Sequence, residues 1–154
     1  MMRTPAVPML CDVNVLLALA TDRHAAHTAA VRWLDDVPAG GATICRIAQT
    51  GLLRLLNNPA VMREDVLDTT ACWGLWRRFL EDERIHFIPT EPPSLDAAFE
   101  RFTSGRMFTP KLWTDAYLAA YAQVSGLVLV TFDHGFRQFD SLACHVLESG
   151  QLPP

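Results

Sequence analysis

Three aspartates occupy positions in this sequence where their carboxylates could act together. Asp12 stands inside an apolar block, and Asp133 directly follows a continuous apolar stretch, Leu127–Phe132. Asp115 lies in the first turn of the helical segment that leads into that stretch. Two carboxylates about 4 Å apart repel by roughly 4 kcal/mol at an effective dielectric constant near 20. Such a group must therefore take up a proton or bind a divalent cation.

The chemistry that these carboxylates would support is metal-assisted hydrolysis. A carboxylate-rich pocket that keeps several water molecules suits Mg²⁺, with Mn²⁺ as a substitute. Such an ion lowers the pKa of a bound water molecule and binds a phosphate oxygen, as cleavage of a phosphodiester requires. Structural roles are the alternative: Asp115 as a favourable charge at a helix N-terminus, and Asp133 as a turn residue. Asp12 is harder to explain structurally, because a charge in an apolar block is costly unless something compensates it.

The segments that would position these aspartates alternate between strands and helices. Short apolar stretches predict strands, and apolar residues at helical spacing predict the segments between them. This order indicates an α/β sandwich with a mostly parallel central sheet of about four or five strands, in one domain over residues 1–154. The predicted strands are Val7–Cys11, Ala42–Ile44, Ile85–Ile88, Leu127–Phe132 and Cys144–Leu147. The predicted helices are Val13–Ala20, His24–Val37, Arg46–Asn57, Asp65–Asp82, Ser94–Phe102 and Trp113–Val124.

A parallel sheet would bring the three aspartates to one edge. Ligands of such sheets bind at the carboxyl ends of the strands, and both Asp12 and Asp133 follow a predicted strand. Asp115 begins a helix antiparallel to the strand that follows it, so it starts where that strand ends. We therefore expect one acidic pocket at the carboxyl edge of the sheet.

The segments that contain these aspartates resemble those of a known family. Leu10–Leu17 (LCDVNVLL) is similar to the opening strand and helix of PIN-domain ribonucleases. Thr114–Ala122 (TDAYLAAYA) and Leu129–Asp133 (LVTFD) are similar to the closing block of the family. The resemblance covers nearly the whole chain, and a stand-alone domain of this size is similar to the VapC-type toxins of bacterial toxin–antitoxin pairs. It implies a PIN-like fold, Mg²⁺-dependent endoribonuclease activity, a homodimer, and inhibition by a cognate antitoxin.

The resemblance also implies roles for individual residues. Asp12 and Asp115 match the principal metal ligands of the family, and Asp133 matches the further acidic position after the late strand. Thr131 matches a hydroxyl residue of the family that hydrogen-bonds a metal ligand or a water molecule and so orients it. Asn14 matches the polar residue that the family often has near the first aspartate.

One position departs from the pattern of the family. Many PIN domains place a glutamate on the helix after the second strand, and Gln49 occupies that region here. An amide can hydrogen-bond a metal-bound water molecule but contributes no charge. The site would then carry one negative charge fewer, which weakens the case for two tightly bound ions. The alternative is that Gln49 is a solvated helix residue.

Four further residues are expected near the same edge and are candidates to contact RNA. Arg46, Lys111 and Arg137 are basic, and His134 adjoins Asp133. An ordinary surface charge is the alternative for each of them. The formal net charge of −4 gives no basic footprint over the whole sequence, and no RNP motif, aromatic stacking platform or basic arm is recognisable. The sequence therefore does not indicate which RNA would be cut.

Composition indicates a cytoplasmic protein with no membrane segment. The four cysteines are scattered, without a Cys-x-x-Cys pair, which favours buried thiols in a reducing compartment. The apolar stretch Val13–Ala20 is too short to cross a bilayer, and the N-terminus lacks an export pattern.

Two other function classes stay open at this stage. The first is a Mg²⁺-dependent phosphatase or phosphoacceptor domain, which needs an acid close to its aspartyl nucleophile and a lysine late in the chain. Asp12 has no acidic residue within two positions, and the only lysine is Lys111. The second is a PIN-like protein-binding module without catalytic activity. The three aspartates argue against this module, and Gln49 argues slightly for it.

Overall fold

Five short parallel strands form the centre of the molecule in the computed structural model, which describes residues 7–107 and 109–149. The strands lie in the order β3-β2-β1-β4-β5, and all the described neighbours pair in parallel. The parallel sheet predicted from the sequence is confirmed. The strands are β1 (Met9–Cys11), β2 (Ala42–Cys45), β3 (Ile85–Ile88), β4 (Val128–Thr131) and β5 (Cys144–Val146).

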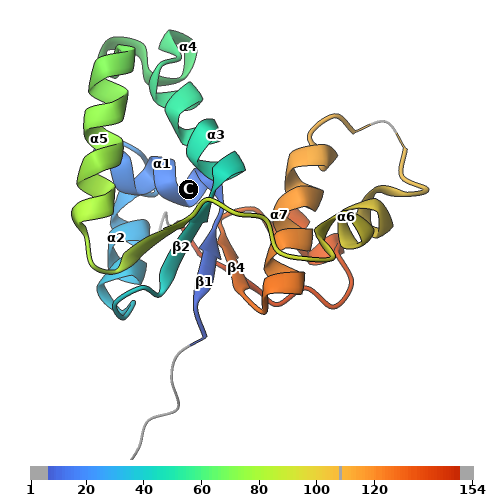
Figure 1. The fold of residues 1–154 in the computed structure, drawn as a ribbon. Helices are drawn as coiled ribbons and strands as arrows, with labels where there is room; N and C mark the ends of the chain where they lie inside the picture. Colours follow the sequence, from blue (N-terminus) through green and yellow to red (C-terminus); the bar gives the residue numbers. More distant parts are fainter. Residues whose placement is uncertain (1–6, 108, 150–154) are drawn as a thin grey trace, which may run out of the picture.

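Helices cover both faces of this sheet. Figure 1 shows α1, α2, α3 and α5 on one side of the strands and α6 and α7 on the other. This is the three-layer α/β arrangement expected from the alternating elements. The helices are α1 (Val13–Ala20), α2 (His27–Asp35), α3 (Arg46–Leu56), α4 (Pro59–Met62), α5 (Thr69–Glu81), α6 (Leu95–Thr103) and α7 (Leu112–Ser125). Two 3₁₀ turns, η1 (Arg63–Asp65) and η2 (His134–Gln138), complete the described elements.

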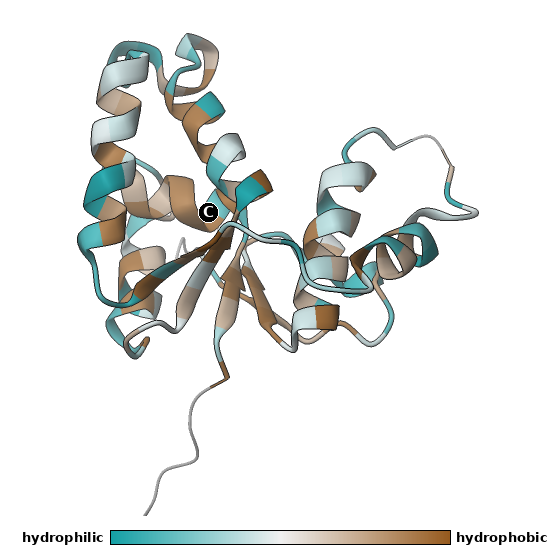
Figure 2. Ribbon diagram, viewed as in Figure 1, coloured by the Kyte–Doolittle hydropathy of each residue, from teal (hydrophilic) through white to brown (hydrophobic). Residues whose placement is uncertain are grey.

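The two central strands are apolar because helices cover them from both sides. Leu10 of β1 and Leu129 and Val130 of β4 are fully buried. Strands of this kind carry continuous hydrophobic runs instead of alternating ones. In Figure 2 the strands are accordingly among the most hydrophobic parts of the ribbon, while the outer helices alternate between hydrophilic and hydrophobic turns.

Two helices begin three or four residues later than the sequence predicts, each after a local turn. The segment expected to be helical from His24 begins at His27, because the Ala26 N–H donates to His24 Nδ1 in a turn before the helix. The segment expected to be helical from Asp65 begins at Thr69 as α5, with a 3₁₀ turn before it. Polar side chains stabilise such starts by accepting backbone N–H groups that have no partner within the helix.

The sequence predicts buried thiols and no membrane-spanning segment. Cys11, Cys45 and Cys72 are buried free thiols, and Cys144 is half-buried. Burial raises the pKa of the Cys11 and Cys45 thiols, which keeps them protonated and unreactive near neutral pH. No helix within the described ranges is long and apolar enough to cross a membrane.

Candidate active site

Asp12 is held rigidly at the junction of β1 and α1. Its side chain is only 7% exposed, and it caps the first turn of α1. Oδ1 accepts a hydrogen bond from the Val13 N–H at 2.7 Å, and Oδ2 accepts one from the Thr131 hydroxyl at 2.7 Å. These two bonds compensate part of the cost of burying the carboxylate, which explains how a charge fits in an apolar block.

Thr131 links the ends of the two central strands. Its buried hydroxyl donates to Asp12 and accepts from the Asp133 N–H at 2.9 Å and from Asn14 Nδ2 at 3.4 Å. Asn14 Oδ1 in turn accepts from the Phe132 N–H at 3.3 Å. A hydroxyl has one donor and two acceptor sites, and all three are used here. Thr131 and Asn14 therefore position Asp12 and Asp133 relative to each other, which is the supporting place that the resemblance implies for both.

Lys111 lies between the other two aspartates. Its Nζ is 2.8 Å from Asp133 Oδ2 and 4.0 Å from Asp115 Oδ2. Asp133 also accepts the Gly135 N–H through Oδ1 at 2.8 Å, which caps η2. The Asp115 side chain is 17% exposed and that of Lys111 is 75% exposed, so the ammonium closes the pocket from the solvent side.

The charges of the three aspartates interact. Burial raises the pKa of Asp115 to about 6, with a further contribution from Asp12 and Asp133, while Lys111 opposes the rise. Burial also raises the pKa of Asp12, and the charge of Asp133 adds to this. The pKa of Asp133 is lowered, first by its hydrogen bond from Lys111 and then by that from Gly135. The structure thus brings the three carboxylates into one electrostatically coupled group at the carboxyl edge of the sheet.

The donor chemistry of this pocket suits a hard divalent cation, because all its candidate ligands are oxygen atoms. Within residues 7–107 and 109–149, however, no group of three or more His, Cys, Asp or Glu side chains is arranged to hold a metal ion. The positive charge in the pocket is that of Lys111. A bound cation would have to displace or share this ammonium.

Gln49 is buried beside Arg46 near the start of α3. Only 3% of Gln49 is exposed, which contradicts the alternative of a solvated helix residue. Its Oε1 accepts a hydrogen bond from Arg46 Nη1 at 2.6 Å. Among the hydrogen bonds of the described residues, none joins Gln49 to the three aspartates. The Gln49 amide therefore positions the guanidinium of Arg46, a partner that the sequence did not indicate.

The two remaining RNA-contact candidates lie in the turn after β4. His134 and Arg137 are exposed in η2, and His134 Nε2 is 3.9 Å from Glu148 Oε1. The charge of His134 contributes to lowering the pKa of Asp133, so this side chain lies near the pocket. Their role toward RNA stays a proposal.

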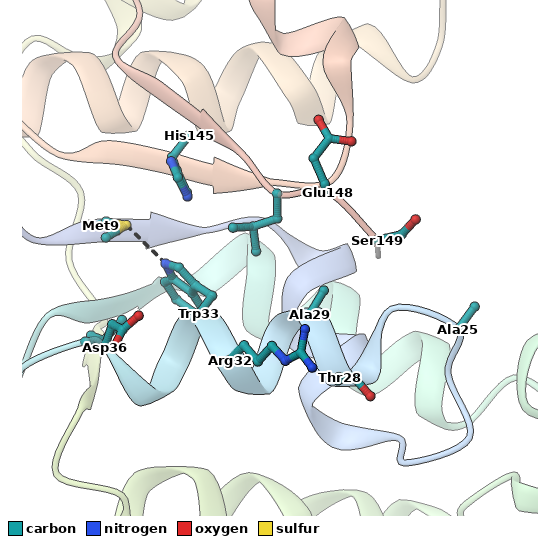
Figure 3. Close-up of a pocket in the computed structure, with 12 residues that line it drawn as sticks. Met9, Ala25, Thr28, Ala29, Arg32, Trp33, Asp36, His145, Glu148 and Ser149 are labelled. Carbon is teal, nitrogen blue, oxygen red and sulfur yellow. Dashed lines mark hydrogen bonds between the residues drawn. The ribbon is translucent and has the colours of Figure 1, made fainter. Parts of the chain in front are cut away.

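A cavity of about 730 Å³ lies apart from the acidic group, between α2 and the end of β5 (Figure 3). Trp33 forms part of its wall, with Nε1 donating to Met9 Sδ at 3.4 Å. Arg32 and Glu148 also line it, but none of the site residues predicted from the sequence does. The acidic group is therefore the candidate active site on grounds of its chemistry and not of cavity size.

The family model and the similar proteins of known name indicate the same family. The family model described as "PIN domain" matches residues 9–142. Ribonuclease VapC41 of Mycobacterium tuberculosis is 39% identical over 143 residues, which cover 90% of this chain and 98% of the relative. Ribonuclease VapC44 of the same species is 32% identical over 124 residues, covering 80% of this chain and 84% of the relative.

Solved structures share the fold. VapBC2 of Rickettsia felis, bound to a DNA fragment from its promoter, has a TM-score of 0.64 at 12% identity and covers 91% of this chain and 98% of its own. M. tuberculosis VapC20, described as a toxin that cleaves the sarcin–ricin loop, has a TM-score of 0.62 at 18% identity, covering 84% of this chain and 93% of its own. At these identities the likeness concerns the fold alone.

Proposed function

Because this chain belongs to the PIN-domain family, we propose that it is an endoribonuclease of the VapC type, the toxin of a toxin–antitoxin pair. The observation that carries the proposal is that Asp12, Asp115 and Asp133 lie together at the carboxyl edge of the sheet. Thr131 bonds both the Asp12 carboxylate and the Asp133 N–H, and Lys111 lies within 4.0 Å of both Asp115 and Asp133. The identity to ribonuclease VapC41 over nearly the full length of both chains supports the same activity.

We propose that the three aspartates hold a divalent cation, Mg²⁺ or Mn²⁺. When bound, this ion supplies Lewis-acid chemistry toward water and a phosphate oxygen. Thr131 and the Val13 N–H fix the orientation of Asp12, so its position does not depend on the ion. Asp115 has a pKa near 6 and exchanges a proton close to neutral pH, which suits a carboxylate whose charge state changes when a cation arrives.

The basic residues near this edge are proposed to contact RNA phosphates. Lys111 pairs with Asp133 and Asp115 in the protein as it stands, and on substrate binding its exposed ammonium becomes available to a phosphate oxygen. Arg46, His134 and Arg137 are exposed around the same edge. Their number is small, which fits a protein whose net charge is −4 and whose RNA contacts are confined to one edge.

An antitoxin protein and a second copy of the chain are the proposed protein partners. Solved structures with the same fold include VapBC2 of R. felis and VapBC-1 of nontypeable Haemophilus influenzae. A toxin of this kind needs a protein that blocks its acidic edge until it is released. Expression of the chain alone is expected to arrest bacterial growth, and co-expression of the true antitoxin to restore it.

The activity is tested by incubating purified, antitoxin-free protein with total RNA in Mg²⁺, in Mn²⁺ and in chelator. We expect defined fragments with either ion and intact RNA with chelator. Asp12→Asn and Asp115→Asn should abolish cleavage while the protein stays folded, because each change removes a charge and keeps the volume. Asp140→Asn, at an exposed position after η2, is the matched control and should cut normally. Intact RNA under every condition would favour the PIN-like binding module without catalytic activity.

A further inference from the structure

A second cavity, of about 480 Å³, lies at the carboxyl ends of β2 and β3 beside α7. Its volume lies within the usual range of sites for small ligands, about 300–1,000 Å³. Arg46 and Thr50 of α3 line one side, Tyr117 and Tyr121 of α7 another, and Glu91 in the segment after β3 a third. It therefore combines a cation, a carboxylate and two aromatic rings around one opening.

The side of the cavity formed after β3 is fixed to α7 by two hydrogen bonds. The Tyr121 hydroxyl donates to the Thr90 carbonyl at 2.7 Å, and the Tyr117 hydroxyl donates to Glu91 Oε1 at 2.8 Å. Tyr117 and Tyr121 stand four residues apart, on neighbouring turns of the helix, with ring centroids 6.2 Å apart. The Glu91 carboxylate is thus held in place before any ligand binds, and among residues 7–107 and 109–149 no hydrogen bond occupies its Oε2.

Arg46 is held in a similar way from the other side. Its Nη1 donates to Gln49 Oε1, and its guanidinium lies over the Phe87 ring with 4.8 Å to the centroid. The described residues accept one of the five N–H groups of this guanidinium, and the side chain is exposed. The remaining donors form a planar fork that suits a phosphate group.

This cavity adjoins the proposed catalytic edge. β2 and β3 are the next strands after β1 in the sheet, Asp12 directly follows the last residue of β1, and neighbouring strands lie about 4.8 Å apart. The cavity and Asp12 therefore lie at the same edge of the sheet, on strands that are one or two places apart. β2 connects the two regions, because it pairs with β1 and ends at Cys45, directly before Arg46 of the cavity. A strand of RNA that crosses the aspartates toward β3 would reach this cavity with a neighbouring nucleotide.

We propose that this cavity binds one unpaired RNA nucleotide next to the bond that is cut, with Arg46 on its phosphate, the half-buried Tyr117 beside its base and Glu91 on its base edge. The proposal rests on the proposed ribonuclease function and adds a determinant of its sequence preference. Single-stranded RNA is recognised by bases that pack on aromatic side chains and hydrogen-bond through their edges.

The carboxylate of Glu91 predicts which base the cavity prefers. An ionised carboxylate only accepts hydrogen bonds, so it favours a base that offers N–H groups. Guanine presents two adjacent donors, N1–H and N2–H, on its Watson–Crick edge. Uracil places carbonyl oxygens on both sides of its single N–H, and these would repel the carboxylate. We therefore expect guanine to bind best and uracil worst.

The test measures binding without cleavage. Metal-free protein in chelator is titrated with fluorescent uridine octamers that carry one guanosine, one cytidine or neither. The guanosine octamer should bind about five- to tenfold more tightly than the all-uridine octamer, as expected for one bidentate base contact. Glu91→Gln should bring the two affinities within about twofold of each other, and Arg46→Gln should weaken both by roughly fivefold. Glu81→Gln and Arg78→Gln, at exposed positions of α5, are the matched controls.

A photochemical readout keeps the test independent of how the variants fold. A 6-thioguanosine in place of the single guanosine should crosslink to Tyr117 of the wild-type chain, identified by mass spectrometry. Two results would overturn the inference and leave the ribonuclease function standing, provided that wild-type protein cuts RNA. In the first, Glu91→Gln leaves the base preference unchanged. In the second, the crosslink lies outside the cavity. If RNA is not cut but the crosslink reaches Tyr117, the nucleotide site stands and the proposed activity fails. An antitoxin that protects Thr90 and Glu91 from hydrogen exchange, while no crosslink forms, would show that a protein occupies the cavity and would overturn the inference.

Discussion

Lys111 determines the charge of the acidic pocket in the protein as it stands. Three coupled carboxylates would repel one another, and the ammonium at 2.8 Å from Asp133 and 4.0 Å from Asp115 offsets part of this repulsion. The same ammonium competes with any cation for the oxygen atoms of these side chains. Lys111 thus stabilises the fold when no divalent cation is bound, and it weakens the binding of such a cation.

Lys111→Gln should therefore tighten the binding of Mn²⁺ or Mg²⁺ while it lowers stability in chelator. Because the side chain is 75% exposed, its ion pairs are worth about 1 kcal/mol or less, and the gain in affinity should be several-fold. Isothermal titration calorimetry of wild type and variant compares the dissociation constants directly. Arg78→Gln, which removes an exposed positive charge on α5, is the control for a change in net charge. Unchanged or weaker metal binding by the Lys111 variant would show that the ammonium does not compete for the site.

Asp115 should make the metal-free protein less stable as the pH rises. Its pKa is raised from 3.8 to about 6 in the folded chain, so between about pH 4 and pH 6 the folded state keeps a proton that the unfolded state releases. The free energy of unfolding therefore falls through this window and stays low above it. Asp115→Asn removes this cost and should stabilise the protein by about 1–3 kcal/mol at pH 7.5, with little gain at pH 4.

Urea unfolding in chelator at several pH values measures this dependence. The same series on Asp140→Asn, at an exposed position, should match the wild type at every pH. A gain for Asp115→Asn that is equal at pH 4 and pH 7.5 would mean that the carboxyl is not protonated in the folded state near pH 5.

At the scale of elements, the strands and helices that carry the aspartates were predictable because they follow from hydrophobic pattern. The bounds of α1 and β3 agree with the prediction, and the five parallel strands were expected as four or five. The short helix α4 was missed, because Asn58-Pro59 indicates a helix stop, whereas here Asn58 caps a new helix through the Ala60 N–H. A Pro after a capping residue fits the end of one helix and the start of another equally well.

The contacts between elements were not predictable in the same way. The sequence placed Lys111 and Gln49 near the site, but their partners, Asp133 and Arg46, were not apparent. The nucleotide-sized cavity depends on Glu91, which no motif singled out, and on tyrosines that appeared only as part of the TDAYLAAY match. The spacing of apolar residues predicts which face of a helix is buried, whereas the pairing of side chains depends on how the helices pack against one another.

Gly51 and Gly74 provide a matched test of the packing between α1 and α3. A Cβ on Gly51 of α3 would lie 2.9 Å from Cγ2 of Val13, the residue whose N–H binds Asp12. A Cβ on Gly74 of α5 would have no neighbour within 4 Å. Gly74→Ala should therefore stabilise the protein by about 1 kcal/mol through helix propensity. Gly51→Ala should destabilise it by about 1–3 kcal/mol, because a β-branched side chain at close packing cannot move cheaply.

Thermal unfolding of the two variants should give shifts of opposite sign, and Gly51→Ala should also reduce RNA cleavage by displacing Asp12. Adding Val13→Ala to Gly51→Ala should recover part of the stability, since it removes the methyl groups that clash. Stabilisation by both single variants would show that α1 and α3 pack less closely than the structure has them.

For the molecule as a whole, the helical layer that contains α2 and α5 has both buried and exposed tryptophans. Trp33 of α2 and Trp76 of α5 are buried and belong to the core. Trp73 and Leu80, seven residues apart on α5, are 47% and 45% exposed. Residues at this spacing share one face of a helix, so they form an apolar stripe on the outside of that layer. A stripe of this kind marks a surface where another protein can bind.

We expect this α5 stripe to lie in the interface of the proposed homodimer. Light scattering at micromolar concentration should give about twice the chain mass of 17.2 kDa, and the double variant Trp73→Arg, Leu80→Glu should reduce it to the monomer value. In a symmetric dimer each change occurs twice across the interface, so like charges would face one another and prevent association. Trp113→Arg is the control, because Trp113 is 60% exposed on α7, across the sheet from α5 (Figure 1). A monomeric wild type would refute the dimer. If the α5 double variant stays dimeric but Trp113→Arg is monomeric, the interface lies on the α6–α7 layer instead.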